Sequence, residues 1–156
     1  MTTRVASADA ASLPAAVAAN TGYLLARLGA ASATAFRDAL APTGLRPRHH
    51  AVLSALAEQP ELSTQHAIGG CLTIDPSTMV TVVDELEARK LVHRRRDPAD
   101  RRRYVLRLTA EGRRMYDRCV VVAEQVEAEL LATLDDEERA TLRLLLQRAL
   151  AVRSQL

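Results

Sequence analysis

Apolar positions recur along most of this chain at the spacing of helices rather than of strands. Between residues 14 and 40 they follow one another at steps of three and four, at Val17, Thr21, Leu24, Leu28, Ala31 and Ala35. This narrow seam predicts a single helix over residues 14–40 that packs against another helix. Apolar stripes predict two more long helices, one over residues 110–134 and one opened by Asp135 and Glu138 as a capping box.

Local start signals divide the middle of the chain into three shorter helices. Pro47 suits the first turn of one helix. Ser63 is a suitable N-cap for a short helix that ends near Leu72. Asp75 is expected to cap the next helix, with Pro76 at its first position.

Alternating positions after these helices predict one β-hairpin. Residues 91–96 and 104–108 are the strand candidates, and the turn residues Asp97-Pro98-Ala99-Asp100 lie between them. The expected fold class is mainly α. A winged helix-turn-helix lobe would span residues 45–109, with the hairpin as its two-stranded wing.

The remaining helices are expected to form a second region. Residues 14–41 and 110–154 are strongly apolar on one side and share no obvious core, so we expect them to form a helical dimerisation region. Residues 1–13 are rich in Ala, Ser and Thr and are expected to form a flexible tail.

Charge is concentrated in the hairpin. The chain of 156 residues has a net charge of only +2, with 48% apolar and 26% charged residues. The window from His93 to Arg103 holds six arginines and two aspartates. A local basic patch on a slightly acidic body is typical of a nucleic-acid-binding protein. With one Phe and no Trp, base stacking on single strands is not expected.

Several other classes of protein lack support in the sequence. The chain has no glycine-rich phosphate loop, no Cys-x-x-Cys pair and no His-Glu-x-x-His signature, so neither an enzyme nor a cofactor is expected. His49, His50, His66 and Cys71 have the spacing of no familiar zinc site, and no metal is expected. With no signal peptide and no long apolar run, we expect a cytoplasmic protein without membrane contact. Cys71 and Cys119 are interpreted as small buried hydrophobes.

Five segments in a fixed order carry a family resemblance. They are Leu62–Gln65, Asp75–Val80, Val83–Arg89, Asp97–Arg102 and Leu106–Gly112. This set resembles the MarR (multiple-antibiotic-resistance regulator) family of bacterial transcription factors over about residues 15 to 152. The resemblance implies a homodimeric, sequence-specific regulator of double-stranded DNA, with repression favoured, acting on a pseudo-palindromic operator. Gly69, Gly70 and Lys90 depart from the usual family pattern.

The resemblance also implies which residues contact DNA. The helix over residues 76–89 would enter the major groove, with the recognition set Asp75, Pro76, Ser77, Thr78 and Thr81. The wing set is Arg94, Arg95, Arg96, Asp100, Arg101 and Arg102. One of the last two arginines, preferably Arg102, would enter the minor groove with Asp100 orienting it, while the other three arginines flank phosphates. Ser63, Thr64 and Gln65 would meet a phosphate at a helix start.

Members of this family often respond to a small phenolic or anionic effector. The resemblance places its pocket between the dimer helices and the DNA-binding lobe, near Tyr23, Arg27, His49, His50 and Met115. The histidines have an alternative role in packing or at an interface, and Arg27 in an interface salt bridge.

Two other functions remain open at this point. One is a winged-helix module that binds proteins, although the arginine-rich hairpin argues against it because phosphate is its natural counterpart. The other is a redox-sensing regulator that uses Cys71 or Cys119.

Overall fold

The computed structural model describes residues 13–59, 61–97 and 104–153. Its elements, in chain order, are α1 (Ala15–Ala18), α2 (Thr21–Leu40), the 3-10 turn η2 (Ala41–Thr43), α3 (Pro47–Glu58), α4 (Gln65–Leu72), α5 (Pro76–Ala88), β1 (Val92–Arg96), β2 (Tyr104–Leu108), α6 (Ala110–Leu130) and α7 (Asp136–Arg153). The predicted fold class, mainly α with one two-stranded hairpin, is confirmed. The expected tail falls outside the described residues, apart from Leu13.

One predicted helix is divided in two, and one predicted cap is wrong. The single helix expected over residues 14–40 is divided, because the Asn20 side chain accepts a hydrogen bond from the Tyr23 N–H and begins a new helix there. At α4 the N-cap is Thr64 rather than Ser63, and the Thr64 hydroxyl accepts from the Ala67 N–H at 3.2 Å. The apolar periodicity runs through Asn20 without a break, and at α4 it does not choose between the adjacent candidate caps Ser63 and Thr64.

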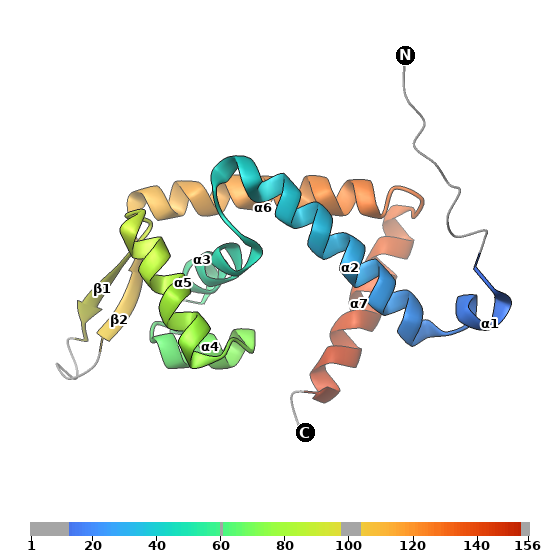
Figure 1. Ribbon diagram of the computed structural model, residues 1–156, viewed down its shortest axis with the longest axis horizontal. Helices are drawn as coiled ribbons and strands as arrows, with labels where there is room; N and C mark the ends of the chain where they lie inside the picture. Colours follow the sequence, from blue (N-terminus) through green and yellow to red (C-terminus); the bar gives the residue numbers. More distant parts are fainter. Residues whose placement is uncertain (1–12, 60, 98–103, 154–156) are drawn as a thin grey trace, which may run out of the picture.

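The hydrophobic core lies in the lobe formed by α3, α4, α5 and the hairpin. Leu53, Ile68, Val83 and Leu86 are fully buried there, and Leu106 of β2 joins them. The first half of α6 closes this core through Cys119 and through the partly buried Met115. The lobe forms one end of the molecule in Figure 1, and the hairpin projects from it beyond α5.

The hairpin is antiparallel and is tied to the lobe at its base. Val92 pairs with Leu108 and Arg96 with Tyr104, and residues 97–103 connect the two strands. The Leu106 N–H donates to the Ser63 carbonyl at 2.6 Å, which links β2 to the segment before α4. The end of the hairpin that is near the core is therefore fixed to the helices that precede it.

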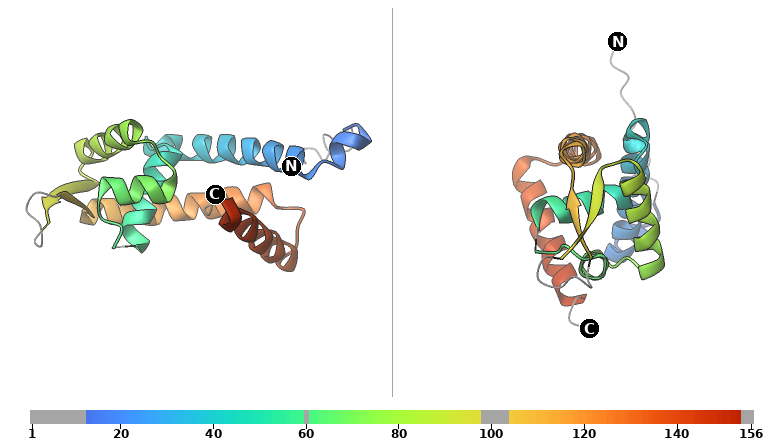
Figure 2. Two further views of the ribbon diagram at one scale, coloured as in Figure 1. Left: turned by 90° about the horizontal axis from the view of Figure 1, so that it is seen from below. Right: turned by 90° about the vertical axis from the view of Figure 1, so that its left-hand side faces the viewer.

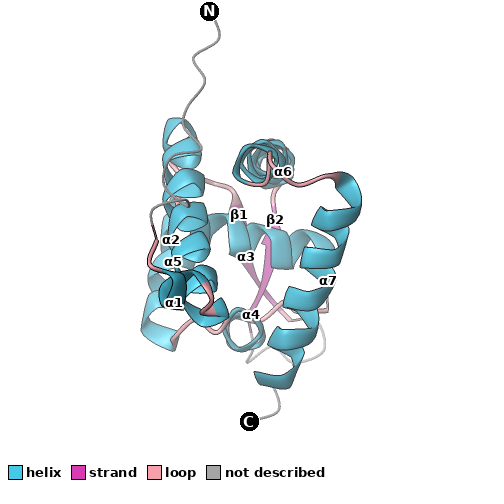
Figure 3. Ribbon diagram, turned by 90° about the vertical axis from the view of Figure 1, so that its right-hand side faces the viewer, coloured by secondary structure: helices cyan, strands magenta, loops and turns pink. Residues whose placement is uncertain are grey.

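The other helices extend away from the lobe. Helices α2 and α6 contact each other and run along the molecule, while α7 turns back after the predicted Asp135–Glu138 capping box (Figures 1 and 2). Viewed along the length of the molecule, α2 and α7 lie on opposite flanks with α6 between them (Figure 3). Large apolar side chains remain exposed on α2 and α7, among them Leu24, Leu25, Leu145 and Leu150.

Two glycines mark where the helices of the lobe approach each other closely. A Cβ at Gly112 in α6 would collide with the Leu91 carbonyl oxygen, so the backbones meet where no side chain fits. A Cβ at Gly69 would lie 3.2 Å from the Ile74 carbonyl oxygen, which supports the close packing of α4 there. At Gly70, by contrast, a Cβ would meet no atom within 4 Å.

Alanine substitution at positions 112 and 70 should therefore change the free energy of unfolding in opposite directions. Gly112→Ala is expected to lower the free energy of unfolding by about 3 kcal/mol, because the lobe must open to admit the methyl group. Gly70→Ala has room for its methyl group and should raise stability by up to about 1 kcal/mol, the helix-propensity difference. Urea denaturation followed by circular dichroism measures both, and equal stability of the two variants would contradict this packing.

Candidate nucleic-acid interface

The N-terminus of α5 is organised by Asp75. Its carboxylate accepts from the Thr78 N–H at 2.9 Å and from the Ser77 hydroxyl at 2.6 Å, and Pro76 occupies the first helical position. The hydrogen bonds from Ser77 and Thr78 hold the pKa of Asp75 well below its usual range. The predicted cap is confirmed. Asp75 is thus an ionised helix cap whose oxygens serve its own helix.

The exposed face of α5 differs in part from the predicted reading set. Ser77, Val80, Thr81 and Asp84 are exposed, at the spacing of one helix face. Thr78 is partly buried and lies toward α3, in a cleft that it shares with Thr81, Arg46 and Glu85. Val80 and Asp84 were missed, although the i, i+3, i+4, i+7 spacing from Ser77 already points to them.

One ion-pair cluster joins α5 to the start of α3. The side chain of His49 is fully buried, and its Nε2 lies 2.6 Å from Glu85 Oε2. The Arg46 N–H donates to His49 Nδ1 at 3.0 Å, and the Arg46 guanidinium also binds Glu85. Because Nδ1 accepts a hydrogen bond from the Arg46 N–H, Nε2 must carry the ring proton and donate to Glu85.

The protonation states of this cluster follow from its surroundings. Burial lowers the pKa of His49, and the hydrogen bond to Glu85 opposes that effect only in part. The hydrogen bond from Arg46 lowers the pKa of Glu85. A neutral imidazole and an ionised carboxylate are therefore the stable pair. They fix the middle of α5 to α3, and His49 has the packing role that was the alternative to a ligand contact.

A second ion-pair cluster joins α5 to the wing. The Arg94 guanidinium of β1 binds both Asp84 and Glu87, and the Arg94 N–H donates to Glu87 Oε1 at 3.2 Å. Arg94 was predicted to flank a phosphate, but in the structure its charge is already shared by two carboxylates of α5. It sets the angle between the helix and the hairpin.

The other wing cations are placed differently. Arg95 and Arg96 are exposed, and the Arg96 guanidinium lies 5.4 Å from the centre of the Tyr104 ring. Asp100, Arg101 and Arg102 lie outside the described residues.

The predicted phosphate contacts lie at the start of α4, next to the hairpin. Thr64 caps the helix, the Ser63 carbonyl binds β2, and Gln65 is the first helical residue. The Gln65 Nε2 is buried without a hydrogen-bond partner among the described residues.

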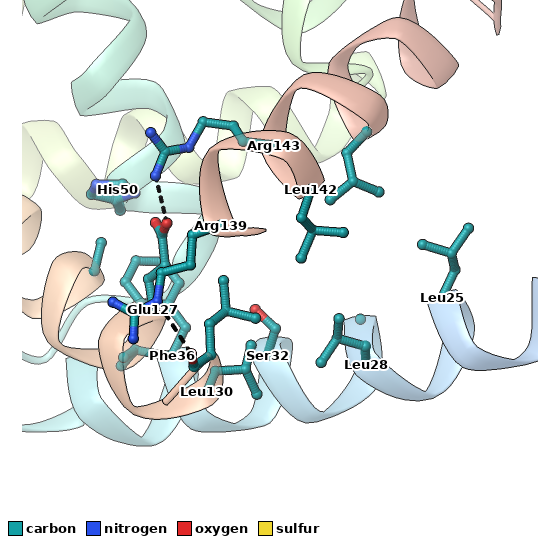
Figure 4. A pocket seen from close by; sticks show the side chains of 15 residues that line it. Leu25, Leu28, Ser32, Phe36, His50, Glu127, Leu130, Arg139, Leu142 and Arg143 are labelled. Carbon is teal, nitrogen blue, oxygen red and sulfur yellow. Dashed lines mark hydrogen bonds and ion pairs between the residues drawn. The ribbon is translucent and has the colours of Figure 1, made fainter. Parts of the chain in front are cut away.

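An apolar pocket lies away from this interface, between α2, α6 and α7. Its volume is about 480 Å³. It is lined by Leu25, Leu28, Gly29, Ser32, Phe36, His50, Ala123, Val126, Glu127, Leu130, Leu131, Arg139, Leu142, Arg143 and Leu146. Figure 4 shows the side chains of Leu28 and Leu142 facing a common space. Arg143 binds Glu127 at 2.7 Å, and Arg139 donates to the Leu131 carbonyl at 3.2 Å (Figure 4).

The five residues predicted for an effector site are spread over the fold. His50 lines the apolar pocket and meets Phe36 edge to face, with ring centres 5.1 Å apart. His49 belongs to the Glu85 cluster, and Met115 packs on the lobe core. Tyr23 and Arg27 lie on the exposed part of α2 and are not among the residues that line this pocket.

The two cysteines have different environments. Cys119 is buried as predicted, and burial raises the pKa of its thiol, which keeps it protonated and unreactive. The prediction for Cys71 is wrong, because its side chain is exposed. Cys71 follows the buried Ile68 by three residues, a spacing that suggests a shared face, but it lies in the last turn of the eight-residue α4, where its side chain is exposed.

Two further findings concern only the part of the chain that the structure describes. Within residues 13–59, 61–97 and 104–153, no group of three or more His, Cys, Asp or Glu side chains could hold a metal ion. None of the helices in those ranges is both long and apolar enough to cross a membrane.

The fold and this surface together define a class of protein. A capped helix lies beside a cationic hairpin on a small helical core, and ion pairs fix the helix on both sides. This is the arrangement of a winged helix-turn-helix protein, in which the helix enters the major groove of duplex DNA.

Comparisons with known proteins identify the family. A sequence model of the MarR family matches residues 43–103. A candidate transcriptional regulatory protein for the hcr operon of Thauera aromatica is 34% identical over 133 residues, 85% of this chain and 80% of that protein. The chain belongs to the MarR family, and it is a DNA-binding transcriptional regulator rather than an enzyme.

Two solved structures are similar over most of their length. CouR from Rhodococcus jostii RHA1, bound to p-coumaroyl-CoA, is 36% identical with a TM-score of 0.75, covering 86% of this chain and 94% of that one. The MarR-family protein Rv2887 of Mycobacterium tuberculosis, in complex with DNA, is 27% identical with a TM-score of 0.72, covering 84% and 98%. The predicted family and DNA-binding function are confirmed, and the protein-interaction alternative is set aside.

Proposed function

We propose that this regulator acts as a homodimeric repressor in the cytoplasm and binds a pseudo-palindromic operator. The observation that carries the proposal is the pair of ion-pair clusters on α5. Glu85 fixes the helix to α3 and Arg94 fixes it to the wing, while the face between them remains exposed. A rigid, outward-facing helix beside a cationic hairpin suits the major groove and the adjacent backbone.

The DNA contacts divide between the helix and the wing. The exposed residues Ser77 and Thr81 face the bases, and the exposed Arg95 and Arg96 meet phosphates. Arg102, with Arg101 beside it and Asp100 as its orienting partner, enters the minor groove. The start of α4, with Gln65, meets a phosphate.

Exposed leucines support the homodimer. Leu24 and Leu25 on α2 are 42% and 44% exposed, and Leu145 and Leu150 on α7 are 52% and 65% exposed. Covering apolar surface of this kind on two long helices with a second copy of the chain removes it from water and stabilises a dimer. A two-fold dimer would present two α5 helices about 34 Å apart, at successive turns of the major groove.

The apolar pocket supports release of DNA by a small effector. Its walls are mainly apolar, with six leucines and Phe36, and the guanidinium groups of Arg139 and Arg143 lie beside them. Such a lining suits an aromatic anion, and the similar CouR was crystallised with p-coumaroyl-CoA. Because α2 and α7 both line the pocket, a bound ligand changes their packing and with it the spacing of the two lobes.

The minor-groove role is tested by removing one wing arginine. Arg102→Ala should weaken operator binding about tenfold and leave the free energy of unfolding unchanged. Arg148→Ala is the matched control, since it removes one exposed arginine from α7, far from the wing. Fluorescence anisotropy over a salt series measures both, and equal affinities for the two variants would contradict the proposal.

The effector role is tested by filling the pocket. Gly29 lines it, and a Cβ there meets no atom within 4 Å, so Gly29→Leu adds a side chain at this wall without a collision of its Cβ. In gel shifts with aromatic carboxylates and their CoA thioesters, including p-coumaroyl-CoA, at least one compound should release the wild-type protein from DNA. Gly29→Leu should bind DNA normally and no longer respond. A wild-type protein indifferent to the whole panel, or a variant that still responds, would refute this assignment.

A further inference from the structure

The outward face of α5 carries an apolar side chain at its centre. Ser77, Val80, Thr81 and Asp84 form this face, and Val80 is 48% exposed. A β-branched residue has a lower helix propensity than alanine, and its exposure to water gains no burial in the isolated protein. Its stiff side chain, however, presents two methyl groups in one fixed orientation.

The polar groups around Val80 are already engaged within the protein. The Ser77 hydroxyl donates to Asp75 at 2.6 Å, and the Thr81 hydroxyl donates to the Ser77 carbonyl at 3.2 Å. Each hydroxyl has a single hydrogen to donate. Donation to a base would therefore break the Ser77–Asp75 hydrogen bond or the bond from Thr81 back to the preceding turn.

Asp84 is engaged as well. Its carboxylate accepts from the Arg94 guanidinium, which it shares with Glu87. The hydrogen-bond donors of this face are thus directed inward, and its apolar groups are the side chain of Val80 and the methyl group of Thr81.

The neighbouring helix leaves one side of Val80 open. Val80 borders a recess of about 420 Å³ between α4 and α5, which Gly70 and Met79 also line. A Cβ at Gly70 would meet no atom within 4 Å, so packing does not require glycine there. Because residue 70 is glycine, no side chain of α4 at this position fills the recess beside Val80.

Only one kind of apolar group is available in the major groove. Thymine carries a C5-methyl group there, whereas the other bases present hydrogen-bond donors and acceptors. We propose that Val80, together with the Thr81 methyl group, specifies thymine in each operator half-site through contact with its C5-methyl group.

The test removes single methyl groups from the DNA. An operator is first selected from a random duplex pool with the wild-type full-length protein, and each thymine is then replaced by deoxyuridine, which pairs identically but lacks the methyl group. At one or two positions per half-site, the replacement should weaken wild-type binding about threefold to fourfold, the effect of one buried methyl group.

Protein variants assign those positions to Val80. Val80→Ala should lose most of the difference between the thymine and deoxyuridine operators at the sensitive position, because only the Thr81 methyl group remains, while the same replacement elsewhere has its wild-type effect. Val80→Thr keeps one methyl group and should retain part of the sensitivity. Val121→Ala is the control, because Val121 is similarly exposed but lies on α6. Ala is a better helix former than Val, so folding is preserved.

Each other outcome overturns the inference. Selected half-sites without thymine, wild-type binding that ignores every deoxyuridine, or a Val80→Ala variant with unchanged sensitivity would each exclude the contact. Failure of the wild-type protein to bind any duplex would also remove the DNA-binding function, and this result is distinct from binding that ignores the methyl groups.

Discussion

The hydrogen bond between the buried His49 and Glu85 of α5 determines how this molecule presents its recognition surface. Without a partner, the ring N–H of a fully buried histidine would be left unsatisfied, which is costly in a protein interior. Glu85 removes that cost only when α5 lies in one rotation about its own axis. That rotation also turns Val83 and Leu86 into the core and Val80 outward. Packing and the reading face are therefore coupled through one carboxylate.

The wing depends on the same helix. Arg94 forms ion pairs with Asp84 and Glu87. The angle between the hairpin and the lobe is therefore set by α5 rather than by the residues that connect the two strands. The Ser63 carbonyl holds the other strand through Leu106. Arg94 itself contributes little to contact with the DNA backbone, because its charge is neutralised within the protein.

Local sequence signals predicted much of the fold, but they could not indicate contacts between residues that are far apart in the sequence. The Asp75 cap and the Asp135–Glu138 capping box involve residues only three positions apart, so the local sequence is sufficient to predict them. His49 and Glu85 are 36 positions apart, and nothing in either neighbourhood indicates that they meet. The break at Asn20 was missed because the apolar positions keep their helical spacing on both sides of it, and the cap at Thr64 was missed because Ser63 beside it suits the same role. Val80 was missed because the hydroxyl groups of Ser77 and Thr81 are the more obvious candidates for hydrogen bonds to bases. Only the structure shows that both hydroxyls already donate within the protein.

The most direct measurement is the ratio of affinities for the selected operator and for an unrelated duplex, in the wild-type protein and in Glu85→Ala. Glu111→Ala is the control, since it removes an exposed carboxylate of α6 that is paired with Arg114. The account predicts that the ratio falls at least tenfold in Glu85→Ala, with a folded protein and retained binding to unrelated DNA, and stays at the wild-type value in Glu111→Ala. An unchanged ratio in a folded Glu85→Ala protein would contradict the claim that this carboxylate orients the recognition helix.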